Sequence, residues 1–388
     1  MTSTLNLKAL LFFYYSAMTI IIGYLPVYFH ENGLSGGQIG FLLAVGPLAA
    51  MIAQPFWGYM TDKYKTSKKV IIACLLGAIL GAVFMFNIYN YILLIFAVFF
   101  FFAFMSPVGG LGDSLSQKTA NRLSVSFGSI RLWGSLGFAI MSLLGGFLLA
   151  KMGVQYIFLP FLFFILLTLG IAFGVKDVET SKKPIVLKEA IKLLRNKKFM
   201  FFLVIMMLLT ITHRTNDSFL GIYIVEKGGS ESFIGWAWFI GVMSEAFIFA
   251  TATLWFRKYH ALTFIVISGI LFAIRWFIMG IIQDPMLVLP LQIMHGLTFG
   301  MFYLCAFHFI TKLIPEELQS TGHLLFYSFF FGLSGMIGSS IGGIIIEEVS
   351  ASYLYSILAF VAAAGALSIG IYKMIYFGLS KEKLLEEQ

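Results

Sequence analysis

A series of long apolar runs constrains this chain more than any other feature. A helix that crosses about 30 Å of hydrocarbon needs about 20 mostly apolar residues. Of the 388 residues, 60% are hydrophobic and only 11% are charged, which is too little polar surface for a soluble protein of this size. We therefore predict an all-α integral membrane protein with twelve transmembrane helices. The expected spans are 9–29, 39–60, 70–89, 91–112, 126–150, 155–175, 199–225, 233–256, 261–282, 286–310, 322–346 and 353–377.

The basic residues predict the orientation of the chain. With an even number of helices both termini lie on one side, and nearly all Lys and Arg outside the spans fall in the loops of that side. Only Lys151 and Lys227 fall on the other side. We expect both termini to be cytoplasmic in a multi-pass protein of the cell membrane. The net charge of +8 then reflects orientation and needs no nucleic-acid partner. The first span is too long for a signal peptide and no small-x-small cleavage site follows it.

No cofactor, metal or enzyme signature is visible. Cys74 and Cys305 lie in apolar runs on different predicted helices, which favours packing over a disulfide or metal cluster. His295 and His308 are too far apart for one helical turn, and no His-Glu-x-x-His motif occurs. We expect no cofactor, no metal and no enzymatic activity. The expected partners are the lipid bilayer, a small-molecule substrate and protons, with the protein a monomer.

The two halves of the sequence repeat each other. A constant offset without a gap relates residues at the turn from the first to the second span to residues at the turn from the seventh to the eighth. The matched residues are Tyr28, Glu31, Gly33, Ser35, Ile39 and Gly40 with Tyr223, Glu226, Gly228, Ser230, Ile234 and Gly235. We predict two pseudo-symmetric six-helix halves, 1–175 and 199–388, joined by a cytoplasmic linker, 176–198. Transporters built this way bind substrate near the bilayer midplane and expose it alternately to each side.

The loop after the second predicted helix resembles a known signature. Gly58, Asp62 and Lys63, followed by Lys68-Lys69, are similar to the Gly-x-x-x-Asp-Arg/Lys-x-Gly-x-Lys/Arg motif of the major facilitator superfamily. The second glycine is missing, and an ordinary positive-inside loop is the alternative. The resemblance implies a gating motif in which Gly58 permits close helix contact and Asp62 caps a neighbouring helix or pairs with a cation.

The segment that begins Gly128-Ser-Ile-Arg131 resembles the fifth helix of lactose permease and its phenylpropionate and nucleoside relatives. This resemblance implies that Asp113 and Arg131 bind or organise substrate, and that Phe138 stacks against it. An ionised side chain near the bilayer midplane costs roughly 2.5–3.5 kcal/mol, so such residues need partners or a water-filled cavity. The alternative is a structural ion pair near the helix ends, with Arg131 reaching the interface.

The second half continues the resemblance. Met243-Ser244-Glu245 is similar to the Met-Gly-Glu of the permease family, and Arg275 and His295 match members of its coupling network. The resemblance implies that Glu245 belongs to both the substrate site and proton transfer, with Arg275 and His295 in proton coupling. An acid that alternates between a protonated and a paired ionised state can carry a proton through an apolar pathway. For His295, a neutral core histidine bonded to a hydroxyl is equally open.

The match has clear limits. Thr298 stands where the family has its coupling acid, and Gln292 where it has a lysine. The seventh span instead carries the polar run His213-Arg214-Thr-Asn-Asp217, which has no residue-by-residue counterpart. Arg214 and Asp217 are three residues apart and can pair on one helical face. That pair is either self-contained or takes part in substrate or proton handling, with Asp217 a second candidate proton carrier.

We therefore predict a proton-coupled symporter that imports a small polar organic solute by alternating access. A sugar or glycoside, a nucleoside and an aromatic acid are all open. The alternative is a proton-driven efflux antiporter for drugs or amphipathic compounds, which the aromatic and methionine content favours. A receptor without transport is a third reading. The fixed charges of Asp113, Arg131 and Glu245 favour a substrate that forms hydrogen bonds.

Overall fold

The structure is a computed structural model that describes residues 2–125, 127–177, 193–256, 260–314 and 319–377. Within these ranges all regular secondary structure is helical, and twelve stretches are long and apolar enough to cross a membrane. The predicted all-α membrane fold with twelve spans is confirmed. The first set of helices is α1 (Thr2–Glu31), α2 (Gly36–Tyr64), α3 (Ser67–Asn87), α4 (Tyr91–Leu123), α5 (Phe127–Met152), η1 (Val154–Tyr156) and α6 (Phe158–Gly174). The second set is α8 (Lys197–Glu226), α9 (Glu231–Ala250), α10 (Ala252–Trp255), α11 (Ala261–Ile281), η3 (Pro285–Leu287), α12 (Val288–Leu291), η4 (Gly296–Gly300), α13 (Met301–Leu313), α14 (Gln319–Tyr327), η6 (Ser328–Leu333), α15 (Ser334–Glu348) and α16 (Ala351–Phe377).

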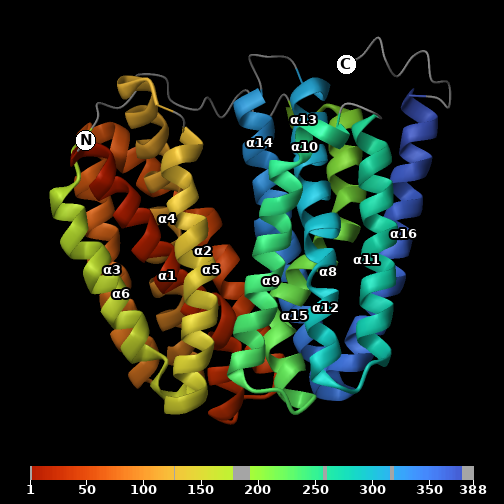
Figure 1. Cartoon of the computed structure of the whole chain (residues 1–388), viewed down its shortest axis with the longest axis horizontal. Helices are drawn as coiled ribbons and strands as arrows, with labels where there is room; N and C mark the ends of the chain where they lie inside the picture. Colours follow the sequence, from red (N-terminus) through yellow and green to blue (C-terminus); the bar gives the residue numbers. More distant parts are fainter. Residues whose placement is uncertain (1, 126, 178–192, 257–259, 315–318, 378–388) are drawn as a thin grey trace. The chain divides into compact units, whose positions relative to one another are not determined.

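The chain divides into two compact units; in Figure 1 most of the first is red to yellow-green and most of the second is green to blue. One unit is Met1–Pro184 with Ser230–Trp236, and the other is Ile185–Gly229 with Ala237–Gln388. Most of the predicted linker, 176–198, lies outside the described residues, because 178–192 are not described. The predicted boundaries at 175 and 199 therefore stay a prediction.

The repeated turn has the same backbone in both halves. Gly33 and Gly228 each adopt φ +83°, a left-handed conformation that glycine reaches without a steric penalty. Ser35 then caps the N-terminus of α2 with a capping box, in which its side chain accepts from Gln38 N and the Gln38 side chain accepts from Ser35 N. The sequence repeat thus marks a turn with a real conformational requirement.

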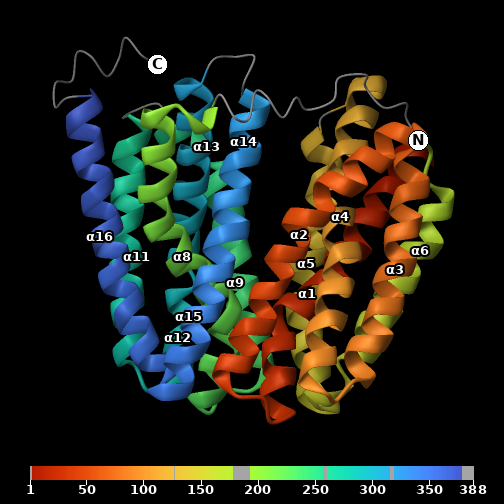
Figure 2. The same ribbon diagram turned by 180° about the vertical axis from the view of Figure 1, so that it is seen from behind.

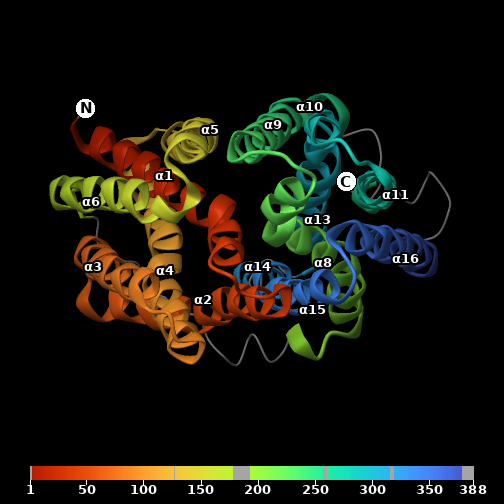
Figure 3. The same ribbon diagram turned by 90° about the horizontal axis from the view of Figure 1, so that it is seen from below.

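In the first unit, α1 packs between α5 and α6, and α3 packs on α4 and α6 (Figure 3). The contact between α1 and α5 is very close, because a Cβ added to Gly137 would overlap the Phe12 carbonyl. Two hydroxyls of α1 bond across this contact: Ser16 donates to Gly137 O at 3.3 Å and Thr19 to Phe138 O at 3.4 Å. A small residue at the crossing point brings the two backbones together, as is common in membrane bundles.

In the second unit, α16 packs along α11 and against α8, and α15 also packs on α8 (Figure 2). Gly269 of α11 lies against Ala366 of α16, where an added Cβ would come within 2.9 Å of the alanine Cβ. Tyr355 of α16 donates to Asn216 of α8 at 3.0 Å, in a fully buried position. Small residues and satisfied polar pairs therefore hold these three helices together.

Three predicted spans are less regular than expected. The span predicted at 233–256 breaks at Thr251, between α9 and α10. The spans predicted at 286–310 and 322–346 each contain a π-helical segment, η4 and η6. Such widened turns interrupt the normal i→i−4 hydrogen-bond ladder and occur frequently at functional sites. Hydropathy does not reveal them, because they leave the apolar composition unchanged.

Candidate functional site

The first candidate cluster joins three helices of the first unit. Arg131 of α5 lies 3.0 Å from Asp113 of α4, measured from Nε to Oδ1. Its Nη2 donates to the Tyr15 hydroxyl of α1 at 3.0 Å, and its guanidinium lies 4.3 Å from the centre of the Tyr15 ring. The carboxylate side chain is 35% exposed and the arginine side chain 30%. This cluster is a partly exposed ion pair.

Gly134 makes room for this arrangement. It lies one turn after Arg131 on α5, and an added Cβ would come within 2.6 Å of the Tyr15 ring and 2.8 Å of Arg131 Nη1. A larger residue there would push the tyrosine and the guanidinium apart. Phe138, the predicted stacking residue, is half-buried on the same helix. Trp133 is 40% exposed and packs its edge against Phe12.

The second cluster lies in the second unit and contains the predicted acid of α9. Glu245 Oε2 is 3.6 Å from Nε2 of His295, the residue just before η4. The glutamate side chain is 23% exposed, whereas that of the histidine is 8% exposed. The structure therefore gives His295 a carboxylate neighbour. A carboxyl group and an imidazole are both groups that can gain and lose a proton.

Close backbone packing holds Glu245 beside His295. A Cβ added to Gly296 would overlap the Ser244 carbonyl, so only glycine fits between α9 and η4 at this point. Ser244 Oγ also accepts from Gly296 N at 2.9 Å and donates to Gln292 O at 3.3 Å. Because Ser244 and Gly296 adjoin Glu245 and His295 in sequence, this contact fixes the separation of the two side chains.

Arg275 of α11 is fully buried and held by neutral groups. Its Nη2 donates to Gln292 Oε1 at 2.6 Å and its Nη1 to Thr298 Oγ1 at 3.2 Å. Its guanidinium also lies 4.7 Å from the ring of Trp276. Among the described residues no carboxylate lies within ion-pair distance of it. The two positions that depart from the permease pattern, Gln292 and Thr298, are thus the ones that hold this arginine.

A third cluster lies on α8. Arg214 Nη1 is 2.8 Å from Asp217 Oδ2, so the pairing predicted from their spacing is present. The same carboxylate oxygen is 3.4 Å from Nε2 of His213, one turn earlier. His213 stacks on Phe299 of η4 with a ring separation of 4.2 Å, and its ring centre is 5.5 Å from that of His295. The α8 cluster and the Glu245–His295 pair are therefore neighbours within one unit.

The predicted gating loop connects α2 to α3. A Cβ added to Gly58 would meet no described atom within 4 Å, so the close helix contact predicted for Gly58 is not observed. Lys63 is exposed, and the side chain of Asp62 lies outside the described residues. Asp177 also bonds the start of α3: it accepts from Ser67 N at 3.1 Å, from Lys68 N at 3.3 Å and from the hydroxyl of Thr66, the N-cap residue of α3.

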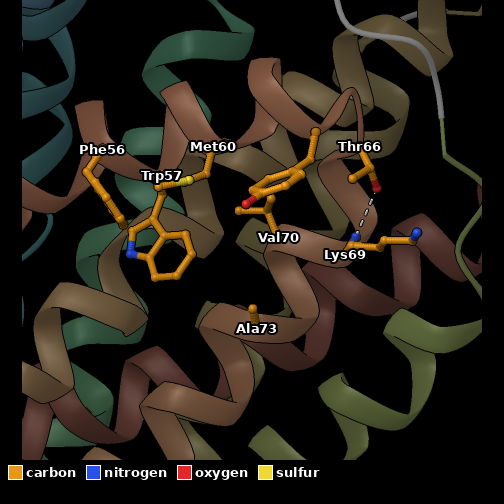
Figure 4. Close-up of a pocket in the computed structure, with 8 residues that line it drawn as sticks. Phe56, Trp57, Met60, Thr66, Lys69, Val70 and Ala73 are labelled. Atoms are coloured by element: carbon orange, nitrogen blue, oxygen red, sulfur yellow. Dashed lines mark hydrogen bonds between the residues drawn. The ribbon is translucent and has the colours of Figure 1, made fainter.

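A groove of about 420 Å³ lies beside this loop, between α2 and α3 (Figure 4). Trp57, Met60 and Val70 line it, and Lys69 N donates to Thr66 Oγ1 at its rim. Apart from Lys69, its lining contains none of the charged residues described above. Phe56, which also lines it, is 49% exposed, and such an apolar, exposed lining is typical of a lipid-facing surface. We do not assign the substrate to it.

Comparison with known proteins defines the family. Residues 4–357 match the model of the MFS_1 like family. The chain belongs to this family of major facilitator superfamily transporters. It is a multi-pass membrane transporter of small molecules, and neither the family nor its relatives are enzymes.

Individual relatives cover most of the chain. The maltose permease of Geobacillus stearothermophilus is 28% identical over 352 residues, which are 89% of this chain and 88% of the permease. A probable 3-phenylpropionic acid transporter of Escherichia coli (strain K12) is 27% identical over 319 residues, 79% of this chain and 82% of that protein. The crystal structure of the nucleoside transporter NupG superimposes with a TM-score of 0.83 at 18% identity, covering 96% and 99% of the two chains. That last likeness concerns the fold alone.

Sequence reasoning did not assign roles to two of the residues in these clusters. Tyr15 gave no signal, because a tyrosine in an apolar span is ordinary. His213 was part of the noted polar run, yet its contact with His295 joins two helices that are far apart in the sequence. A histidine one turn before a buried aspartate is the signal that could have drawn attention to it.

Proposed function

We propose that this transporter is a proton-coupled symporter that imports a small polar organic solute. The observation that carries the proposal is the pair of accessible charged clusters inside membrane-spanning helices, Asp113–Arg131 and Glu245–His295. Charged side chains at such depth are costly, and those kept partly exposed are typical of substrate and ion pathways. The names of the maltose permease and the 3-phenylpropionic acid transporter support a sugar or an aromatic acid as the solute.

The two clusters have different roles: the first binds the solute and the second also carries the proton. Asp113, Arg131 and Tyr15 offer a carboxylate, a planar guanidinium and a ring, which suit a hydroxyl-rich or carboxylate-bearing solute with an apolar face. Phe138 supplies a further ring on the same helix. Glu245 with His295 carries the proton and touches the substrate, while Asp217 and Arg275 complete the coupling network. Protonation of an acid removes its charge and so lowers the cost of moving it through an apolar region.

Cellular placement is part of the same proposal. The protein acts as a monomer in the cell membrane. Both of its termini lie in the cytoplasm, because positively charged loops stay on that side. Gly58, Asp62 and Lys63 belong to the cytoplasmic gate. Transport follows alternating access, the mode of transporters with this internal repeat.

A thermal-shift screen identifies the solute class. A ligand that binds only the folded state raises the melting temperature of the purified protein. The panel contains maltose, lactose, sucrose, uridine, 3-phenylpropionate and a cationic dye. Stabilisation by one polar solute, followed by its pH-gradient-driven uptake into vesicles that contain the protein, is the expected result. Stabilisation by the dye alone, with dye export against a proton gradient, would replace symport with efflux.

A further inference from the structure

Two histidines link the carboxylates of the second unit. His213 Nε2 faces Asp217 at 3.4 Å, and His295 Nε2 faces Glu245 at 3.6 Å. The two ring centres are 5.5 Å apart with a 46° angle between the rings. Each imidazole thus has one nitrogen toward its own acid, and the rings lie next to each other. The order in space is acid, histidine, histidine, acid.

The surroundings of His213 exclude water. It is 3% exposed, and three rings from different segments, Phe272, Phe299 and Phe330, lie around it. Its Nδ1 is buried and has no hydrogen-bond partner among the described residues. A buried imidazole nitrogen without a bond is costly, and a group that passes a proton intermittently keeps such a nitrogen available. A purely structural histidine would be expected to bond both nitrogens.

We propose that His213 and His295 form a bridge that carries a proton between Glu245 and Asp217. This inference rests on the proposed proton coupling and adds His213 to it. Glu245 gives its proton to His295 Nε2, and the opposite nitrogen of that ring releases a proton toward His213. His213 Nε2 then delivers a proton to Asp217 Oδ2. One proton moves in total, and both rings end neutral in the other tautomer. Reorientation of the two rings closes the gap between them.

Protonation of Asp217 weakens its ion pair with Arg214. As an ionised carboxylate, Asp217 pairs with Arg214 at 2.8 Å. When it is protonated that ion pair loses its charge attraction, and Arg214, 24% exposed, is released as a cation. A proton that binds at the partly exposed Glu245 and crosses the bridge thus leaves Arg214 of α8 as an unpaired positive charge.

Charged and titratable groups from four helices face the bridge. Both carboxylates and Arg214 have been described above. Arg275 donates a hydrogen bond to Thr298, which is the third residue after His295. Tyr355 of α16 reaches the same region through Asn216. The full set is Arg214 and Asp217 from α8, Glu245 from α9, Arg275 from α11 and Tyr355 from α16.

Infrared spectroscopy tests the bridge without substrate or transport. The protein in lipid vesicles is transferred to D2O, and the shift of the protonated carboxyl C=O band is followed in time. The C=O band of protonated Asp217 is identified as the band that is missing from the spectrum of the Asp217→Asn variant. We expect its exchange to slow by about tenfold or more in His213→Gln, because glutamine bonds the carboxyl but cannot relay a proton. His295→Gln should slow it similarly.

The matched control is His308→Gln, since His308 packs on Phe256 and is in neither acid–histidine pair. It should leave the exchange rate unchanged. Equal rates in His213→Gln and the native protein would overturn the bridge, as would the absence of any band assignable to Asp217. Should His213→Gln fail to fold, His295→Gln decides the question by the same measurement.

The outcome is separable from that of the proposed function. Slow exchange in His213→Gln together with transport that ignores the pH gradient would keep the bridge and reject symport. Normal exchange together with proton-coupled transport would reject the bridge and keep symport.

Discussion

The charged residues inside the spans differ in what holds them. Arg275 is buried and bonded by neutral side chains, whereas Arg131 is paired with an acid and partly exposed. A buried cation held in this way has a structural or coupling role, because a ligand cannot reach it. An exposed pair retains accessible donors and acceptors. The two arginines therefore call for different experiments.

Neutralising the Asp113–Arg131 pair should remove ligand binding. Asp113→Asn and Arg131→Gln each break the ion pair but keep a hydrogen-bonding side chain of similar size. Because the pair is partly exposed, we expect little loss of stability and a loss of the ligand-induced thermal shift. Melting curves with and without the stabilising solute measure both effects. A large drop in the melting temperature with the ligand shift retained would assign the pair to structure.

Neutralising Glu245 should separate proton movement from substrate movement. Glu245→Gln cannot exchange a proton, yet it can still form hydrogen bonds near His295. We expect substrate-driven proton uptake into vesicles to disappear while substrate exchange across the membrane persists. Asp62→Asn is the comparison, with slower turnover and intact proton dependence. Undiminished proton uptake in Glu245→Gln would move the carrier role to Asp217, and next to His295.

At the scale of single elements, short backbone approaches decide where the functional side chains lie. The Glu245–His295 pair depends on the contact of α9 with η4, and the Arg131–Tyr15 pair depends on the contact of α1 with α5. In both places a glycine removes the atom that would keep the helices apart. The π-helical segment η4 begins at Gly296, so His295 lies at the point where the helix changes to π-helical geometry.

Gly296 offers a test of this dependence. Gly296→Ala places a methyl group on the Ser244 carbonyl, which should cost about 1–3 kcal/mol of stability by overpacking. Proton-coupled uptake should fall as well, because α9 must move away from His295. Gly170→Ala in α6 is the control, since nothing lies within 4 Å of its added Cβ. Equal melting temperatures for both variants would show that the close contact does not govern the pair.

Asp177 anchors the end of the first set of helices to the start of α3. It accepts from two backbone N–H groups of α3, as an N-terminal capping carboxylate does. Lys68 completes the link by donating to Phe173 O of α6 at 2.6 Å. We expect Asp177→Ala to lower the free energy of unfolding by about 1 kcal/mol, measured as a reduced melting temperature. Lys176→Ala, a change at an exposed neighbour, should have no such effect, and equal losses would argue against the cap.

At the scale of the whole molecule, each unit has one end whose loops are rich in Lys and Arg. At that end, hydrogen bonds join helices of the same unit. In the first unit, Asn6 near the start of α1 donates to Gly174 O at the end of α6. In the second, Tyr372 near the end of α16 donates to Lys198 O at the start of α8. These helix ends carry the loops rich in Lys and Arg, which we expect to lie in the cytoplasm.

Cysteine labelling tests that orientation. Both native cysteines are fully buried, so an impermeant maleimide should leave them unmodified in intact cells. A cysteine in place of the exposed Lys151 should be labelled from outside, whereas one in place of the exposed Lys65 should react only after permeabilisation. The reverse pattern would invert the predicted topology.

The sequence alone determined the number of spans, because backbone in hydrocarbon must bond to itself and long apolar runs therefore become helices. Its motifs also indicated the family. It also predicted the Arg214–Asp217 pair, since three residues on one helix lie on one face. Only the tertiary structure showed that Arg131 meets Tyr15 and that His213 lies beside His295. These partners come from helices distant in sequence, and their separation depends on where glycines let the backbones approach. Local patterns carry no information about such contacts, because crossing points are set by packing between helices.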